Sequence, residues 1–151
     1  IWARGRWLMQ VGLVPPECVV PMWERVLPHM EKAAEYTYGR YTTDDILTAI
    51  TDYDHQLWVA YDGDAIVGIT VTCIKQYPRR RCLDMVFCAG DSGMEWKAPM
   101  LRILQQWAFD SGCDIIESSG RFGWAKIFKD DGYRPLWQVY ELPVAEAGLG
   151  G

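Results

Sequence analysis

Three kinds of residue in this sequence could support chemistry: five cysteines, two histidines and a run of arginines. The cysteines are odd in number and include no C-x-x-C pair, so neither a zinc ribbon nor a closed set of disulfides is indicated. His29 and His55 lie far apart without the spacing of metal ligands, and we expect surface or capping roles for them. The pattern therefore predicts no metal site and favours a reducing compartment, the cytoplasm.

The arginines Arg79–Arg81 follow a proline at a predicted turn, where they could bind a phosphate, RNA or an acidic partner. Three arginines at a turn are more often a solvated edge of a sheet. The chain has 15 Lys and Arg against 20 Asp and Glu, a net charge of −5. This balance argues against binding to nucleic acid or anionic membrane through overall charge. The longest apolar run, Ala65–Ile74, is about half the roughly 20 residues of a membrane span, so no membrane partner is expected.

The 151 residues, half of them apolar, fit one globular domain. We interpret residues 1–8 as a leader and residues 9–144 as the domain. Residues 145–151 are small, glycine-rich and without periodicity, which indicates a flexible tail.

Hydrophobic periodicity predicts alternating strands and helices along this domain. A helix is expected over Glu17–Tyr38, which Pro21 and Pro28 must start or kink, and a short one begins at Thr43. The clearest helical stripe runs from Trp96 to Ala108 and ends at Gly112, and a short helix is expected over Gly123–Lys129. The predicted strands are Trp7–Val14, Gln56–Tyr61, Ala65–Gln76, Arg81–Cys88, Asp114–Ser118 and Tyr133–Pro143, the second to fourth forming an antiparallel meander.

Five of the eight tryptophans fall on these apolar stripes and are expected in the core. They are Trp23, Trp58, Trp96, Trp107 and Trp137. Trp124 follows Gly123 and is instead expected to face a cleft or a partner.

The order of these elements resembles that of the GNAT superfamily, the acyl-CoA-dependent N-acetyltransferases, over about Met9–Val144. The passage Leu57–Gly68 is similar to the family's second and third strands, and Ile127–Tyr133 to its closing helix and strand. The spacing from Val86 to Leu101 also matches the stretch that joins the fourth strand to the long helix. The resemblance implies a single GNAT-like α/β (α+β) domain, with a mixed, mostly antiparallel sheet of about six to seven strands and about four helices.

The resemblance also implies acetyl-CoA as the cofactor. Backbone groups of Val86, Phe87 and Cys88 would hold its pantetheine arm between two diverging strands. The loop of Ser92, Gly93, Met94, Glu95, Trp96 and Lys97 would meet the pyrophosphate at the start of the long helix. This loop departs from the family pattern R/Q-x-x-G-x-G/A, since Gly93 stands at the Arg or Gln position and Met94 and Trp96 at two glycine positions. Asp91 and Glu95 add negative charge there, and Pro99 has no amide hydrogen.

For catalysis the resemblance implies a carboxylate base and a tyrosine that protonates the departing thiolate. Asp84 on the fourth strand and Glu117 on the fifth are the candidate bases, although strand alternation could equally turn either toward solvent. The usual tyrosine position holds Phe128, so Tyr133 or Cys88 would have to replace it.

The function implied is transfer of an acetyl group from acetyl-CoA to a primary amine of a small molecule or protein. The alternative is a catalytically silent GNAT-fold protein with a binding or structural role, working as a homo-oligomer or with a protein-assembly partner. Ser119–Trp124 is similar to small GNAT-like proteins of tailed bacteriophages, and the alternative would then be a virion or host-interaction component. An RNA-binding module that uses Arg79–Arg81 is disfavoured by the acidic balance.

Overall fold

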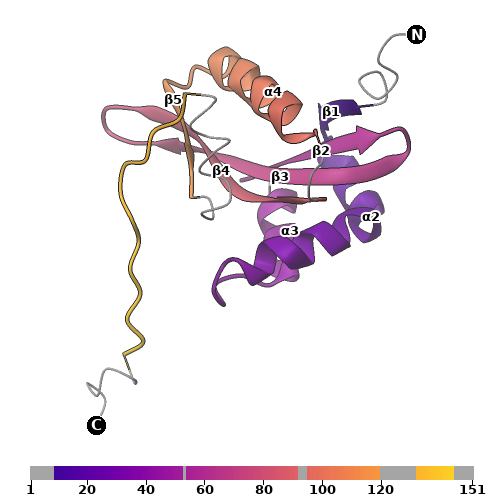
Figure 1. The fold of residues 1–151 in the computed structure, drawn as a ribbon, viewed down its shortest axis with the longest axis horizontal. Coiled ribbons are helices and arrows are strands. Elements are labelled where there is room, and N and C mark those ends of the chain that lie inside the picture. Colours follow the sequence, from indigo (N-terminus) through magenta and orange to yellow (C-terminus); the bar gives the residue numbers. More distant parts are fainter. Residues whose placement is uncertain (1–8, 53, 92–94, 120–131, 145–151) are drawn as a thin grey trace. The chain divides into compact units, whose positions relative to one another are not determined.

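The computed structural model describes residues 9–52, 54–91, 95–119 and 132–144, and the chain divides into two units, Ile1–Ser119 and Gly120–Gly151. The described part of the first unit is a five-stranded sheet with three helices (Figure 1). Its strands are β1 (Met9–Leu13), β2 (Gln56–Asp62), β3 (Ala65–Gln76), β4 (Arg81–Gly90) and β5 (Ile115–Ser118).

The strands lie in the order β1-β2-β3-β4-β5, antiparallel except for the parallel pair of β4 and β5. Tight turns connect the central strands, with Gly63 at a positive φ of 62° between β2 and β3. At the next turn Tyr77 N–H donates to Arg80 O at 2.8 Å, with Pro78 at the first central position, which its fixed φ suits. This confirms the predicted antiparallel meander.

The helices are α2 (Pro16–Glu35), α3 (Thr43–Thr51) and α4 (Lys97–Asp110). The sequence predicted that Pro21 and Pro28 start or kink the first helix. In the structure α2 begins at Pro16, and both later prolines lie inside it. Each interior proline removes one backbone hydrogen bond, and we attribute the continuity of α2 to the apolar face that it buries. A capping box between Thr42 and Asp45 starts α3.

Helices α2 and α3 cover one face of the sheet, and α4 lies on the other (Figure 1). The core on the α2 side includes Val26, Met30 and Ile46 with Val59 and Val71 of the sheet. The prediction of a surface or capping role for His29 is wrong, because its side chain is buried and its Nε2 lies 3.0 Å from Ile66 O. A polar ring buried on a helix face can satisfy one nitrogen through a strand carbonyl, which periodicity does not reveal.

In the second unit, residues 132–144 contain no strand, so the predicted strand over Tyr133–Pro143 is wrong. Trp137, expected in the core, is exposed, as are its large apolar neighbours Leu136, Val139, Tyr140, Leu142 and Val144. Alternating apolar residues show that a segment could bury one face, but a strand forms only with a ladder partner.

The fold class is confirmed, whereas the five strands and three helices of the described residues are fewer than predicted. The predicted leader, the helix over Gly123–Lys129, Trp124 and the tail lie outside the described residues. Among the described residues, no helix is both long and apolar enough to span a membrane.

Candidate active site

The two parallel strands β4 and β5 stay paired over only four residues each. Pairing runs from Cys82, opposite Ile115, to Met85, opposite Ser118, where β5 ends and β4 continues to Gly90. On the other side of β4 the register with β3 shifts, because Thr72 pairs with Met85 but Val71 with Phe87. Val86 is therefore the extra residue of a β-bulge, which bends a strand and increases its twist. The bulge lies where β4 leaves β5.

Beyond the bulge, β4 continues beside β3 to Gly90, and within the described residues β5 does not extend along it. Backbone N–H and C=O groups at the edge of a strand can bind another extended chain. The side chains flanking this edge are packed: the ring of Phe87 meets Tyr41 edge-on with centroids 5.1 Å apart, and Cys88 Sγ lies 3.3 Å from Thr70 Oγ1. The edge therefore offers backbone groups held in place by neighbours on both faces of the sheet.

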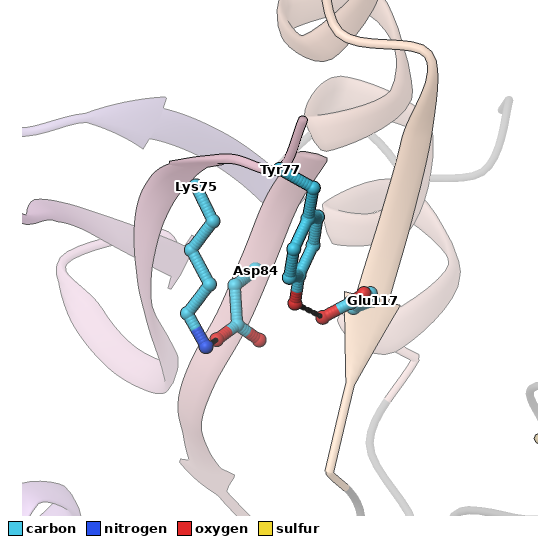
Figure 2. Close-up of polar contacts among 4 residues, drawn as sticks. All are labelled: Lys75, Tyr77, Asp84 and Glu117. Carbon is cyan, nitrogen blue, oxygen red and sulfur yellow. Dashed lines mark hydrogen bonds and ion pairs between the residues drawn. The ribbon is translucent and has the colours of Figure 1, made fainter. Parts of the chain in front are cut away.

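Two carboxylates stand side by side just before the strands separate (Figure 2). Asp84 and Glu117 are register partners on β4 and β5, so their side chains share one face. Asp84 Oδ2 forms an ion pair with Lys75 Nζ at 2.7 Å, and Glu117 Oε2 accepts a hydrogen bond from Tyr77 OH at 2.9 Å. Asp84 is buried, whereas Lys75 is half exposed, so the cluster is open on the lysine side.

The contacts within this cluster shift the pKa values of its members. The hydrogen bond to Asp84 raises the pKa of Lys75, which therefore keeps its charge. The hydrogen bond to Glu117 raises the pKa of Tyr77, so that the phenol stays protonated at neutral pH. Burial, followed by the charges of Glu117 and Asp84, raises the pKa of the Cys82 thiol to about 12. The cluster thus holds proton acceptors beside a neutral phenol and an inert thiol.

His55 lies at the start of β2, within electrostatic range of Asp84 and Lys75. Burial lowers its pKa, against the opposing effect of Asp54 and Asp84, so the ring is neutral at pH 7. Its Nδ1 is buried without a hydrogen-bond partner among the described residues. The structure therefore adds a neutral imidazole to the surroundings of Asp84. Neither here nor elsewhere in the described part of the chain are three His, Cys, Asp or Glu side chains grouped to hold a metal ion.

The start of α4 is dominated by the fully buried side chain of Trp96. Its indole lies against Gly68 and Gly90, which are register partners on β3 and β4, and its Nε1 donates to Asp91 O at 3.3 Å. The helix begins at Lys97, and Pro99 supplies no N–H. Backbone amides of the first turn remain the means by which this end could bind an anion.

The structure brings Asp84 and Glu117 together at the point where β4 and β5 separate, with Val86, Phe87 and Cys88 directly beyond on β4. The side chain of Trp96 is part of the core, while Glu95 is exposed and Lys97 partly so. The predicted cofactor contacts Ser92, Gly93 and Met94 lie outside the described residues. Tyr133 belongs to the second unit, and its catalytic role stays a prediction.

Reasoning from the sequence missed Lys75, Tyr77 and the position of His55. A signal for Lys75 was present, because the turn after Tyr77 fixes an antiparallel register in which Lys75, opposite Cys82, is the diagonal neighbour of Asp84. No comparable signal gave the parallel register of Glu117, which depends on how α4 packs.

Comparison with known proteins gives a likeness of structure only. No protein-family model matches the chain, and a search of curated protein sequences finds no match. Solved structures do match, at low sequence identity. One is aminoglycoside N-acetyltransferase AAC(6')-Iy in complex with CoA: 11% identity, TM-score 0.66, covering 89% of this chain and 93% of that one.

Two further structures show the same likeness. A predicted acetyltransferase from Clostridium acetobutylicum, solved with acetyl-CoA, has 14% identity and a TM-score of 0.64, covering 91% of this chain and 97% of its own. An aminoglycoside acetyltransferase from an uncultured soil metagenomic sample, in complex with sisomicin, has 10% identity and a TM-score of 0.63. The match covers 91% of this chain and 99% of that one. The chain therefore has the GNAT fold, as its order of elements predicted.

Proposed function

We propose that this protein is an N-acetyltransferase that moves an acetyl group from acetyl-CoA to a primary amine of a small molecule or protein. The observation that carries the proposal is the separation of β4 from β5 at the Val86 bulge, with Asp84 and Glu117 at its base. A strand that continues beyond the end of its neighbour, next to two carboxylates, suits a reaction that positions a thioester and deprotonates an amine. The fold shared with acetyltransferases supports the same reaction class.

Acetyl-CoA would supply the acetyl thioester, and the residues present fit it in part. Its pantetheine arm contains amide groups, which could pair with backbone groups of Val86, Phe87 and Cys88, beyond the end of β5, much as a strand would. The pyrophosphate would meet the first-turn amides of α4 and the side chain of Lys97. The exposed Glu95 beside them weakens phosphate binding, so we expect the backbone edge to contribute most of the recognition.

The chain's own residues would then position and deprotonate the acceptor. Asp84 or Glu117 would remove the proton of the amine, because both carboxyl groups stand at the base of the strand separation. An acceptor that carries further ammonium groups would also be attracted by the acidic balance of the chain. One structural neighbour was solved with sisomicin, an observation that supports including aminoglycosides among the acceptors tested.

Thermal denaturation with and without millimolar acetyl-CoA tests the donor. A ligand at 100 times its Kd that binds only the folded state adds about 2.7 kcal/mol, which corresponds to a rise in Tm of roughly 5–10 °C for a domain of this size. Release of free thiol is then followed with sisomicin, propylamine and a lysine-containing peptide as acceptors. The proposal would be overturned if acetyl-CoA did not stabilise the protein and no acetyl transfer to any of these amines were detected.

Matched variants test the base. Asp84→Asn and Glu117→Gln are compared with Asp44→Asn and Glu31→Gln, two exposed acids on helices α3 and α2. Loss of a general base costs about 10²–10⁴-fold in rate. The rate of either Asp84→Asn or Glu117→Gln should therefore fall by at least a hundredfold, while both control variants retain activity. Equal and undiminished rates in Asp84→Asn and Glu117→Gln would exclude both as bases.

The second candidate, a GNAT-fold protein with a binding or structural role, is favoured by one observation. The bulky indole of Trp96 stands at the start of α4, with Glu95 before it and Pro99 just after, where bare backbone would best receive a phosphate. Absence of any effect of acetyl-CoA or CoA on Tm supports this candidate. The compartment, the oligomeric state and the similarity to bacteriophage proteins stay predictions from the sequence.

A further inference from the structure

We propose that Tyr77 and Glu117 form a proton relay for acetyl transfer: Glu117 accepts the proton of the amine and Tyr77 donates a proton to the departing sulfur. The proposal rests on the proposed function and assigns an acid that the sequence did not identify. At the position of the family's usual tyrosine this chain has Phe128, which cannot donate a proton. Tyr77 comes from a different element, the turn that joins β3 to β4.

The geometry of the pair carries the assignment. Tyr77 OH donates to Glu117 Oε2 at 2.9 Å, so a proton can pass between the two groups without rearrangement (Figure 2). Glu117 is one register step from Ser118, the last residue of β5 paired with β4. The phenol is therefore held at the base of the strand separation. The side chain of Tyr77 is only partly buried.

The second carboxylate is less suited to this task, because Asp84 is already engaged by a cation. Lys75 Nζ lies 2.7 Å from Asp84 Oδ2, so this carboxylate is held by the lysine rather than by the phenol. Glu117 instead accepts from a neutral hydroxyl. The charged and titratable groups around the relay are Lys75, Cys82 and Asp84, and the Cys82 thiol keeps its proton, with a pKa of about 12. Glu117 is thus the carboxylate that can exchange a proton directly with the phenol.

The protons and bonds balance over one turnover. The amine nitrogen forms a bond to the acetyl carbonyl carbon as the carbon–sulfur bond breaks, and the electron pair of that bond stays on sulfur. Glu117 takes the proton from nitrogen, and Tyr77 gives its own proton to sulfur. The proton on Glu117 then moves to the Tyr77 oxygen along their hydrogen bond, which restores both groups. The products are an acetamide and a free thiol, and no further reactant is needed.

The dependence of the rate on the leaving group tests the relay. Tyr77→Phe is compared with wild type on two donors, acetyl-CoA and phenyl thioacetate, with the acceptor amine that the wild type uses. An alkyl thiolate needs a proton as it departs, whereas a thiophenolate does not. We therefore expect kcat/KM of Tyr77→Phe to fall at least a hundredfold with acetyl-CoA and less than threefold with phenyl thioacetate. The kcat/KM of Glu117→Gln should fall with both donors, because this substitution removes the base.

Tyr61→Phe is the matched control. Tyr61 lies on β2, and within the described part of the chain its hydroxyl group makes one side-chain contact, with Met22 Sδ at 3.9 Å. This variant should retain the wild-type rate with both donors. If kcat/KM of Tyr77→Phe fell equally with both donors, Tyr77 would have a structural role and the relay would be overturned. An undiminished rate with acetyl-CoA, or full activity of Glu117→Gln, would also overturn it. Failure of the wild type to use acetyl-CoA with any amine would overturn the proposed function itself, and the relay with it.

Discussion

Replacing Gly68 by alanine should destabilise the protein through a clash with Trp96. A Cβ at Gly68 would lie 2.6 Å from the indole atoms Cε2 and Cε3, well inside ordinary carbon–carbon contact. The ring cannot move aside easily, because Trp96 is fully buried and its indole also lies against Gly90. The clash therefore falls on rigid atoms rather than on the end of a flexible side chain.

Overpacking of this kind costs typically 1–3 kcal/mol. For a domain of this size, about 2 kcal/mol lowers Tm by roughly 4–8 °C. Gly12→Ala is the matched control, since a Cβ on that β1 residue meets nothing within 4 Å. It should be neutral or slightly stabilising, because alanine loses less backbone entropy on folding than glycine. Urea unfolding followed by circular dichroism measures both free energies of unfolding.

The Trp96→Leu variant completes a double-mutant cycle with Gly68→Ala. Removing the indole creates space over β3, so the cost of the added methyl group should fall by at least 1 kcal/mol in this background. If Gly68→Ala costs no more than Gly12→Ala, or costs the same with leucine at position 96, the packing argument for the start of α4 is refuted.

Two predictions concern titrating groups near the candidate site. The pKa of His55 is lowered in the folded state, so the unfolded chain binds more protons below pH 6.5, and the stability of the protein falls as the pH falls through that range. The Tm of His55→Gln should therefore decrease less than that of the wild type between pH 7 and pH 5. An identical decrease in both proteins would contradict the assignment. The Cys82 thiol, with a pKa of about 12 against an ordinary 9.0, should react with iodoacetamide at pH 8 about a thousandfold more slowly than an unshifted thiol. Peptide mass spectrometry measures this labelling, and modification of Cys82 as fast as of the partly exposed Cys113 would be incompatible with its burial.

The fold was largely predictable because its signals are local. The apolar stripe from Trp96 to Ala108 predicted α4, and the turns around Gly63 and Pro78 predicted the meander of β2, β3 and β4. The same periodicity was misleading at Trp137, because an alternating pattern can form a strand only beside a partner, and residues 132–144 form none.

The candidate site was predictable only in part. Asp84 and Glu117 were identified through the family resemblance, which did not say whether strand alternation would turn them together or apart. Their partners Lys75 and Tyr77 were not identified, although the turn at Pro78 already fixed the register of β3 with β4. The bulge at Val86 was also missed, because nothing in residue type distinguishes a bulged valine from a paired one.

By itself, the sequence determined which segments form α4 and the meander, and which residues lie opposite one another across each turn, because these depend on neighbours a few positions apart. Only the tertiary structure decided that Glu117 stands beside Asp84, since parallel strands joined through a helix take their register from packing. It also decided that β4 leaves β5 just beyond this pair, and that Trp96 closes over Gly68 and Gly90. Those decisions come from contacts between segments distant in the chain, which no local pattern encodes.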